Sequence, residues 1–144
     1  RAGRAHVVDH RRRQGPRPAS WCGAGGSVTG ADHRRHALLI ASPEYAHGVS
    51  GVMKNALDWM VSCEAFVYKP VAVMNASPRA SHALAALRET LSVMSAQLIE
   101  PASITLPLLG SKLDEDGLVA HPQLAPLLVD AMLHLRQAVL SGRE

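Results

Sequence analysis

The feature that most constrains the fold of this chain is the alternation of short apolar runs with segments of helical periodicity. Residues 37–41 and 71–74 are continuous apolar runs, each about as long as a strand that is covered on both faces. Each run precedes a segment whose apolar residues recur at steps of three and four, as they do on one face of a helix. This alternation is typical of an α/β fold in which helices cover both faces of a parallel sheet. With 144 residues, the chain is long enough for one such domain.

Three helices are expected from the apolar periodicity. The first covers residues 49–60 with Ser50 as its N-cap, and the second covers residues 81–97 with Ser81 in the same role. A closing helix is expected at about residues 124–139, and its prolines are confined to its start, where proline costs least.

Two further segments complete the expected order of elements. Residues 99–106 are expected to form the last strand, although Pro101 interrupts the run. Asp114, Glu115 and Asp116 form an acidic cluster that lacks the later ligands of a calcium loop. We therefore expect a solvated turn at this cluster and no metal site in the chain.

A polar segment separates the first apolar run from the first expected helix. It spans residues 42–48 and reads Ser-Pro-Glu-Tyr-Ala-His-Gly. In open α/β sheets, ligands bind at the carboxyl ends of the parallel strands, where the turns into the helices present backbone N–H groups. The position of this segment therefore predicts a ligand-binding loop.

The residues of this loop and of the helix behind it resemble the NADPH-dependent FMN reductase family. Residues that fall in the family order are Pro43, Glu44, Tyr45, Gly48, Gly51, Lys54, Asn55, Asp58 and Trp59. A second stretch, residues 69–79, resembles the next strand of that family and its second flavin-facing loop. The resemblance covers residues 37–141 and implies a flavodoxin-like, three-layer doubly wound parallel sheet.

The resemblance implies a flavin site built from both loops. The residues expected to bind the cofactor are Pro43, Glu44, Tyr45, His47, Gly48, Ala76, Ser77, Pro78 and Arg79. Tyr45 would supply an aromatic wall, and Gly48 would permit close approach of the backbone. For His47 the alternatives are a hydrogen bond to the flavin edge and an ordinary polar loop position. Arg79 is either a ligand of a phosphate of FMN or NADPH, or an exposed arginine near a helix start.

No catalytic residue is assigned. Hydride transfer between a nicotinamide and a flavin needs little acid–base help, because the cofactors carry the reactive atoms. The serines and histidines of the chain form no nucleophile elbow and no paired metal-ligand spacing. A flavin site needs instead a flat slot in which backbone N–H groups can donate to the edge of the flavin.

The N-terminal part departs from the family pattern. The resemblance implies a first strand and a phosphate-binding loop ahead of residue 37, and neither is recognisable; residues 26–30 resemble that loop only superficially in composition. Residues 1–36 contain eight basic and two acidic residues, a net charge of +6, while the remainder carries seven basic and ten acidic residues, a net charge of −3. We expect a boundary here, with a basic, irregular segment at 1–36 and the reductase domain at 37–144.

Three interpretations of residues 1–36 stay open. They are a truncated or mis-framed start of an ordinary reductase, a genuine basic arm, and an Arg-rich transit-like segment. The abrupt change of composition at residue 37 favours the first. A sheet that lacks its first strand would have an open edge and reduced stability unless another segment covered it.

The expected function is that of an NAD(P)H-dependent FMN oxidoreductase, which passes hydride from NADPH or NADH through FMN to flavin or to small acceptors such as quinones. The expected assembly is a homodimer or homotetramer, with Trp59 either in the core or at a subunit interface. The alternative is a non-catalytic flavodoxin-like remnant that acts through self-association of the helix carrying Trp59. Nucleic-acid binding by the basic segment ranks last, because aromatic residues for base stacking are few.

The expected location is the cytoplasm. The sequence has no apolar run of eighteen residues and no charged start followed by an apolar segment. Its two cysteines, Cys22 and Cys63, do not form the framework of a disulfide-rich fold, which fits a reducing compartment.

Overall fold

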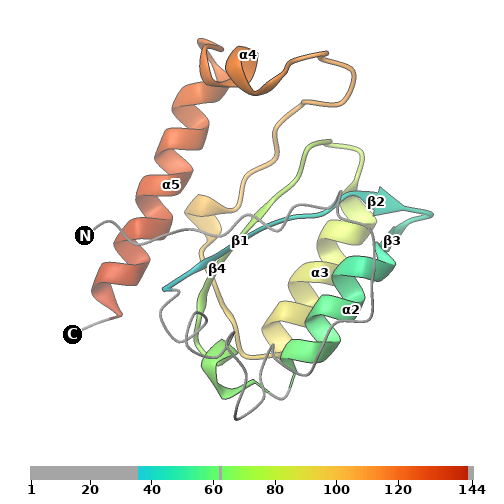
Figure 1. Ribbon diagram of the computed structural model, residues 1–144, viewed down its shortest axis with the longest axis vertical. Coiled ribbons are helices and arrows are strands. Elements are labelled where there is room, and N and C mark those ends of the chain that lie inside the picture. The colour runs from blue at the N-terminus through green and yellow to red at the C-terminus, as the bar shows by residue number, and fades with distance from the viewer. Residues whose placement is uncertain (1–35, 62, 143–144) are drawn as a thin grey trace.

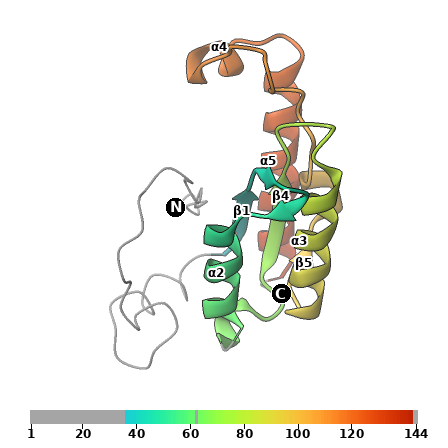
Figure 2. The same ribbon diagram turned by 90° about the vertical axis from the view of Figure 1, so that its right-hand side faces the viewer.

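The computed structural model describes residues 36–61 and 63–142, which form a three-layer α/β arrangement (Figures 1 and 2). The central layer is a parallel sheet with strand order β1-β4-β5. Its strands are β1 (Leu38–Ala41), β4 (Pro70–Met74) and β5 (Gln97–Leu98). Helices α2 (Gly51–Met60) and α3 (Ser81–Val93) cover one face, and α5 (Leu124–Ser141) covers the other. The expected α/β class and parallel sheet are confirmed.

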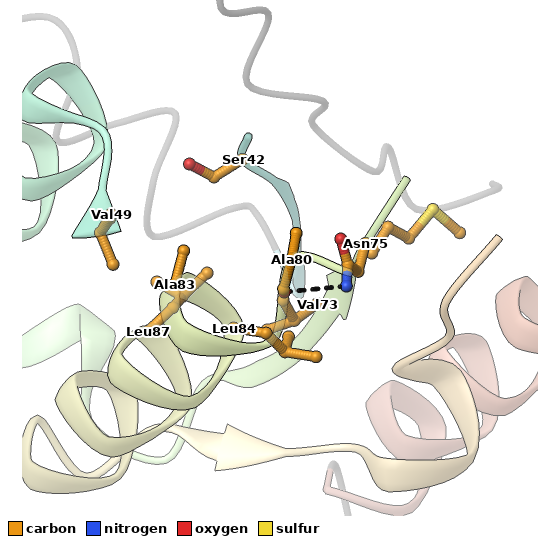
Figure 3. A pocket seen from close by; sticks show the side chains of 9 residues that line it. Ser42, Val49, Val73, Asn75, Ala80, Ala83, Leu84 and Leu87 are labelled. Atoms are coloured by element: carbon orange, nitrogen blue, oxygen red, sulfur yellow. Dashed lines mark hydrogen bonds between the residues drawn. The ribbon is translucent and has the colours of Figure 1, made fainter. Parts of the chain in front are cut away.

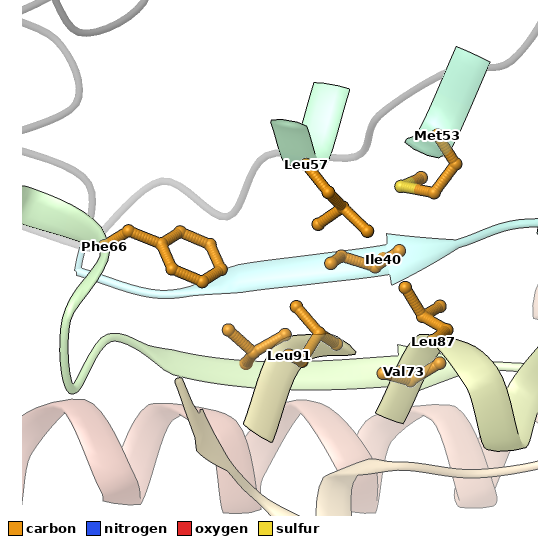
Figure 4. Packing of buried hydrophobic residues seen from close by; sticks show 8 residues of the cluster. Ile40, Met53, Leu57, Phe66, Val73, Leu87 and Leu91 are labelled. Carbon is orange, nitrogen blue, oxygen red and sulfur yellow. The ribbon is translucent and has the colours of Figure 1, made fainter. Parts of the chain in front are cut away.

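Alternate residues of the strands point into two different cores. From β1, Ile40 packs with residues of α2 and α3, whereas Leu39 packs on the side of α5. Figure 4 shows Ile40 facing Leu57 and Met53 of α2, with Leu87 and Leu91 of α3 alongside. The period of two follows from the pleat of a strand, and it explains why each run is apolar at every position.

The core under α5 is built largely from small side chains. Ala37, Ala72 and Ala102 are buried there together with Leu39 and Leu135. Alanines leave little volume between sheet and helix, so α5 can approach the sheet closely. This core supports β1 and β4 from the face opposite to α2 and α3.

The first helix begins as expected. Ser50 is its N-cap and accepts a hydrogen bond from the Met53 N–H at 3.3 Å. Val49, however, belongs to the short strand β3 and not to the helix. Trp59 is 50% exposed, so of its two expected places the core is excluded, and a subunit interface stays a prediction.

The second helix differs from the expectation at both ends. Its N-cap is Ala80, which makes no side-chain hydrogen bond, so Ser81 is the first helical residue and not the cap. The helix ends at Val93 rather than at residue 97, because Ser95 adopts a left-handed conformation with φ of 60°. The Ala96 N–H then bonds to the Leu91 carbonyl at 2.9 Å, which is the pattern of a Schellman motif.

The segment expected as a last strand is mostly not a strand. Residues 97–98 form β5, and residues 100–102 form the 3₁₀ helix η2 (Glu100–Ala102), with Pro101 in its first turn. Beyond η2, Thr105 makes a single parallel bridge to Asn75. Proline has no N–H to donate to the sheet, and its fixed φ suits the start of a helical turn.

The acidic cluster forms a short helix. Asp114 is the N-cap of α4 (Glu115–Val119) and accepts a hydrogen bond from the Gly117 N–H at 2.8 Å. Figure 2 shows α4 standing clear of the sheet, at the top of the view. Strands β2 (Glu44–Tyr45) and β3 (Gly48–Val49) form a separate two-stranded sheet. The remaining element is the 3₁₀ helix η1 (Glu64–Phe66), which precedes β4.

Several expectations concern residues outside the described ranges. The segment 1–35, with the loop-like residues 26–30, is among these, so the boundary between 1–36 and 37–144 stays a prediction. Cys63 is disulfide-bonded, and Cys22 lies outside the described ranges, so the cysteines do not support the argument for a reducing compartment.

Within 36–61 and 63–142, none of the helices has the length and apolar character needed to cross a bilayer.

Candidate functional site

Two loops leave neighbouring strands at the same edge of the sheet. Strands β1 and β4 pair in parallel, and their last residues, Ala41 and Met74, are partners in the register. The next residues, Ser42 and Asn75, therefore open the two loops side by side. This is the edge at which open α/β sheets bind ligands.

The first loop is a tight hairpin. Glu44 and Tyr45 pair with Val49 and Gly48 in antiparallel β2 and β3, so the connection has only two residues. These two residues, Ala46 and His47, have φ of 48° and 58°. Positive φ at both positions is the geometry of a type I′ turn, which normally selects asparagine and glycine. An alanine held in this conformation is strained.

Glu44 has a structural role within the described residues. Its side chain is only 11% exposed, and Oε2 accepts a hydrogen bond from the Ala83 N–H at 2.8 Å. Ala83 is the third residue of α3, whose own N-cap offers no side-chain acceptor. The Glu44 carboxylate therefore satisfies an N–H group at the start of α3 from a distant part of the chain.

The environment of Glu44 favours its ionised form. The hydrogen bond from the Ala83 N–H lowers the pKa of the Glu44 carboxyl below its ordinary value, and the neighbouring His47 acts in the same direction. Desolvation opposes these effects without reversing them. A negative charge is also well placed at the positive end of a helix dipole.

His47 connects the hairpin to α3 a second time. Its Nδ1 lies 3.1 Å from Glu44 Oε1. Its ring meets the ring of His82, the second residue of α3, edge to face, with centroids 4.5 Å apart and an angle of 69° between the planes. The hairpin therefore contacts the start of α3 through Glu44 and His47 together.

The second loop is organised by Asn75, which is 7% exposed. Its Nδ2 donates to the Ala80 carbonyl at 3.1 Å, and its Oδ1 accepts from the Ser77 N–H at 3.2 Å. Ser77 Oγ in turn accepts from the Arg79 N–H at 3.2 Å. One buried amide thus holds both ends of the turn that leads into α3.

The two loops enclose a small hollow, which Figure 3 shows in close-up. Its walls are polar where the loops begin, at Ser42 and Asn75, and apolar toward α3, at Ala83, Leu84 and Leu87. The centre of a water molecule can occupy about 10 Å³ of this hollow, which is enough for one water molecule. A flavin ring does not fit in it, so a flat ligand would lie on the open surface of the loops.

The family is decided by a match to a family model. The model of the NADPH-dependent FMN reductases matches residues 25–108, more than half of the chain. The chain belongs to the NADPH-dependent FMN reductase family. An NAD(P)H-dependent FMN reductase of Pseudomonas aeruginosa is 46% identical over 43 residues, which are 28% of this chain and 23% of that protein.

Solved structures confirm the fold. The flavoenzyme FerB, an NAD(P)H:(acceptor) oxidoreductase from Paracoccus denitrificans, superimposes with a TM-score of 0.58 at 23% identity, over 77% of this chain and 65% of FerB. An oxidoreductase from Corynebacterium diphtheriae gives a TM-score of 0.58 at 22% identity, over 79% of this chain and 60% of that protein. The chain thus spans less than two thirds of each of these relatives.

The FMN reductase loops expected from the sequence lie together, but their residues are differently disposed. Tyr45 is 62% exposed, and His47 and Arg79 are also exposed. Pro43, Gly48 and Ser77 are half-buried, and Ala76 and Pro78 are exposed. This surface suits the ring half of FMN, because it presents an aromatic side chain beside two turns of backbone. The exposed Arg79 places a positive charge in the second loop.

Sequence reasoning missed two residues of this site. Asn75 holds the second loop, and His82 packs against His47. The signal for Asn75 was available, because a polar residue directly after a fully apolar strand is placed to bond the turn that follows. Nothing in the sequence pairs His82 with His47.

In the described part of the chain, no group of three or more His, Cys, Asp or Glu side chains could hold a metal ion.

Proposed function

We propose that this chain binds FMN across the loops at residues 42–49 and 75–80 and contributes to NAD(P)H-dependent reduction of flavin or of small acceptors such as quinones. The observation that carries the proposal is the placement of these loops at the paired carboxyl ends of β1 and β4. Family membership supports the same cofactor. FerB, a flavoenzyme NAD(P)H:(acceptor) oxidoreductase, has the same fold.

The roles of the chain's own residues in this proposal are binding and orientation. When bound, FMN accepts and delivers hydride, so the protein needs no nucleophile or general base. Tyr45 offers its exposed ring as a wall for the flavin, and Gly48 lets the backbone approach it. We assign to Arg79 the binding of a phosphate group of FMN or NADPH by charge-assisted hydrogen bonds.

The proposed assembly is a homodimer or homotetramer that uses the outer face of α2. On this face Trp59 is 50% exposed and Val52 is 36% exposed, seven positions apart and therefore on one side of the helix. Large exposed apolar side chains are common at protein interfaces.

A cytoplasmic location is also part of the proposal and rests on the sequence alone.

A titration of the purified chain with FMN, followed by quenching of flavin fluorescence, tests the proposal. Tyr45→Ala should weaken binding by roughly 5- to 150-fold, because stacking on an aromatic ring is worth roughly 1–3 kcal/mol per base and 1.4 kcal/mol corresponds to a factor of ten. Tyr68→Ala is the matched control, because Tyr68 is 78% exposed and precedes β4 at the opposite end of the strand. Equal binding by both variants, or no binding by a folded chain, contradicts the proposal.

The second candidate is a non-catalytic flavodoxin-like protein that acts through self-association. The observation in its favour is the exposed apolar pair Trp59 and Val52 on the outer face of α2. It predicts concentration-dependent association in analytical ultracentrifugation that Trp59→Ala abolishes, together with no FMN binding. FMN binding would reject this candidate.

A further inference from the structure

The Glu44 carboxylate is shared between two partners that lie in different elements. One oxygen accepts the Ala83 N–H at 2.8 Å, and the other lies 3.1 Å from His47 Nδ1. Ala83 is 39 positions away in the sequence, on α3, whereas His47 is in the same hairpin turn. The side chain is therefore turned toward protein groups on both sides.

The start of α3 depends on this contact from outside the helix. Ala80 makes no capping hydrogen bond, and alanine is among the poorest N-cap residues. Glu44 bonds the N–H of the third helical residue, the same donor that a serine or aspartate cap would normally satisfy. Asn75 holds the residue just before the helix, because its side chain donates a hydrogen bond to the Ala80 carbonyl at 3.1 Å.

The hairpin depends on the contact as well. Its turn residues Ala46 and His47 both have positive φ, so the turn is held against an intrinsic preference. A two-stranded hairpin of this length is not stable by itself. Its contacts with α3 include the Glu44 bond and the edge-to-face contact of His47 with His82, and Val49 lines the same hollow as Ala83 and Leu87.

The same carboxylate sets the hydrogen positions on His47. An ionised carboxylate can only accept hydrogen bonds, so the contact with Oε1 assigns a hydrogen to Nδ1 of His47. In the neutral ring, Nε2 is then the acceptor nitrogen. This ring is exposed at the surface proposed to face the flavin.

We propose that Glu44 is a positioning residue rather than a flavin ligand: it clamps the hairpin of residues 44–49 to the start of α3 and holds His47 with its hydrogen on Nδ1. The clamp makes the two cofactor loops move as one body. This proposal rests on the proposed function in one respect, namely that the two loops bind FMN. Because a carboxylate already occupies the first turn of α3, the proposal also excludes that turn as the main site of a cofactor phosphate.

The clamp can be tested without cofactor. Glu44→Ala should accelerate amide hydrogen exchange at Ala83 by about tenfold or more, because the N–H loses its acceptor. It should also change the ¹⁵N chemical shifts of the His47 ring, which report which nitrogen carries the hydrogen. Glu44→Gln keeps an oxygen acceptor and should restore most of the protection at Ala83, but not the nitrogen shifts of His47.

The matched controls are Glu89→Ala and Glu89→Gln, because Glu89 is an exposed glutamate on the same helix. Both should leave the exchange at Ala83 and the His47 shifts unchanged. Unchanged exchange at Ala83 in Glu44→Ala would overturn the clamp. So would exchange that increases equally in the Glu89 variants, because the effect would then not belong to Glu44.

A titration with FMN separates a clamp from a direct ligand. The clamp predicts that Glu44→Ala weakens FMN binding and that Glu44→Gln recovers most of it, in parallel with the exchange at Ala83. Equal weakening by both variants, with Ala83 still protected in Glu44→Gln, would make Glu44 a direct ligand and overturn the proposal. If no form of the chain binds FMN, the proposed function fails, while the exchange and nitrogen measurements still decide the clamp.

Discussion

The Glu44 carboxylate and the Ala83 N–H, 39 positions apart in the sequence, are joined by a 2.8 Å hydrogen bond between a hairpin and the first turn of a helix. This bond connects the hairpin that follows β1 to the start of α3, directly behind the loop that follows β4. Both loops belong to the surface at which we place FMN. The geometry of the proposed site therefore depends on a contact that neither loop makes alone.

The free energy of unfolding should fall at acidic pH, because Glu44 becomes protonated there. The Ala83 N–H lowers the pKa of Glu44 in the folded protein. The stabilisation is therefore complete above the unfolded-state pKa of about 4.3, and it is lost as the pH falls through the lower folded-state value. Urea unfolding between pH 6 and pH 3 should show a larger loss of stability for the natural chain than for Glu44→Gln. Identical pH dependence for the two proteins would contradict this assignment.

Asn75→Ala should lower the free energy of unfolding by about 1–3 kcal/mol, because it removes a buried donor and acceptor and leaves their backbone partners unpaired. Asn55→Ala is the control, since Asn55 is exposed on α2, and its effect should stay within about 0.5 kcal/mol. Chemical denaturation measures both values. An equal effect of the two substitutions would show that Asn75 does not organise its loop.

The two serines at the starts of α2 and α3 should behave differently. Ser50→Ala should destabilise the protein by about 1 kcal/mol, because Ser50 is the cap of α2. Ser81→Ala should change stability by no more than about 0.5 kcal/mol, because Ser81 is exposed and lies inside α3. Thermal unfolding of the two variants provides the comparison. The reverse order would place the cap of α3 at Ser81 after all.

Ser95→Gly should stabilise the protein by about 0.5–1 kcal/mol. Ser95 has φ of 60° at the end of α3, where a residue with a Cβ is strained and glycine is not. Ser92→Gly, three residues earlier and within the helix, should instead destabilise it by about 0.5–1 kcal/mol. Opposite signs in denaturant unfolding are the expected result. A loss of stability in both variants would count against the left-handed helix end.

Elements with a clear apolar period were predictable from the sequence. The strands at residues 38–41 and 70–74 and helices α2 and α5 follow directly from it. The hairpin at residues 44–49 was not predicted, because its turn is Ala46-His47 and lacks the glycine or asparagine that marks a type I′ turn. The contact with α3 holds this turn in place of local preference.

The errors at α3 and at residues 99–106 have local physical reasons. Ser81 has the chemistry of a cap, but the N–H that it would satisfy is already bonded to Glu44, and sequence patterns carry no sign of such a distant acceptor. Pro101 starts a 3₁₀ turn where a strand was expected, because it cannot donate to the sheet. The loop positions were thus predictable, whereas the roles of Glu44, Asn75 and His82 needed the fold.

The most direct test of the central claim is an NMR titration of the chain with FMN, following backbone amides. The account predicts that the largest shift changes fall on residues 44–48 and 76–80 and that residues 64–68, at the opposite end of the sheet, do not change. Glu44→Ala should reduce the changes in both loops together. Shift changes elsewhere, or none at high micromolar FMN in a folded chain, would contradict the assignment of these loops to the cofactor.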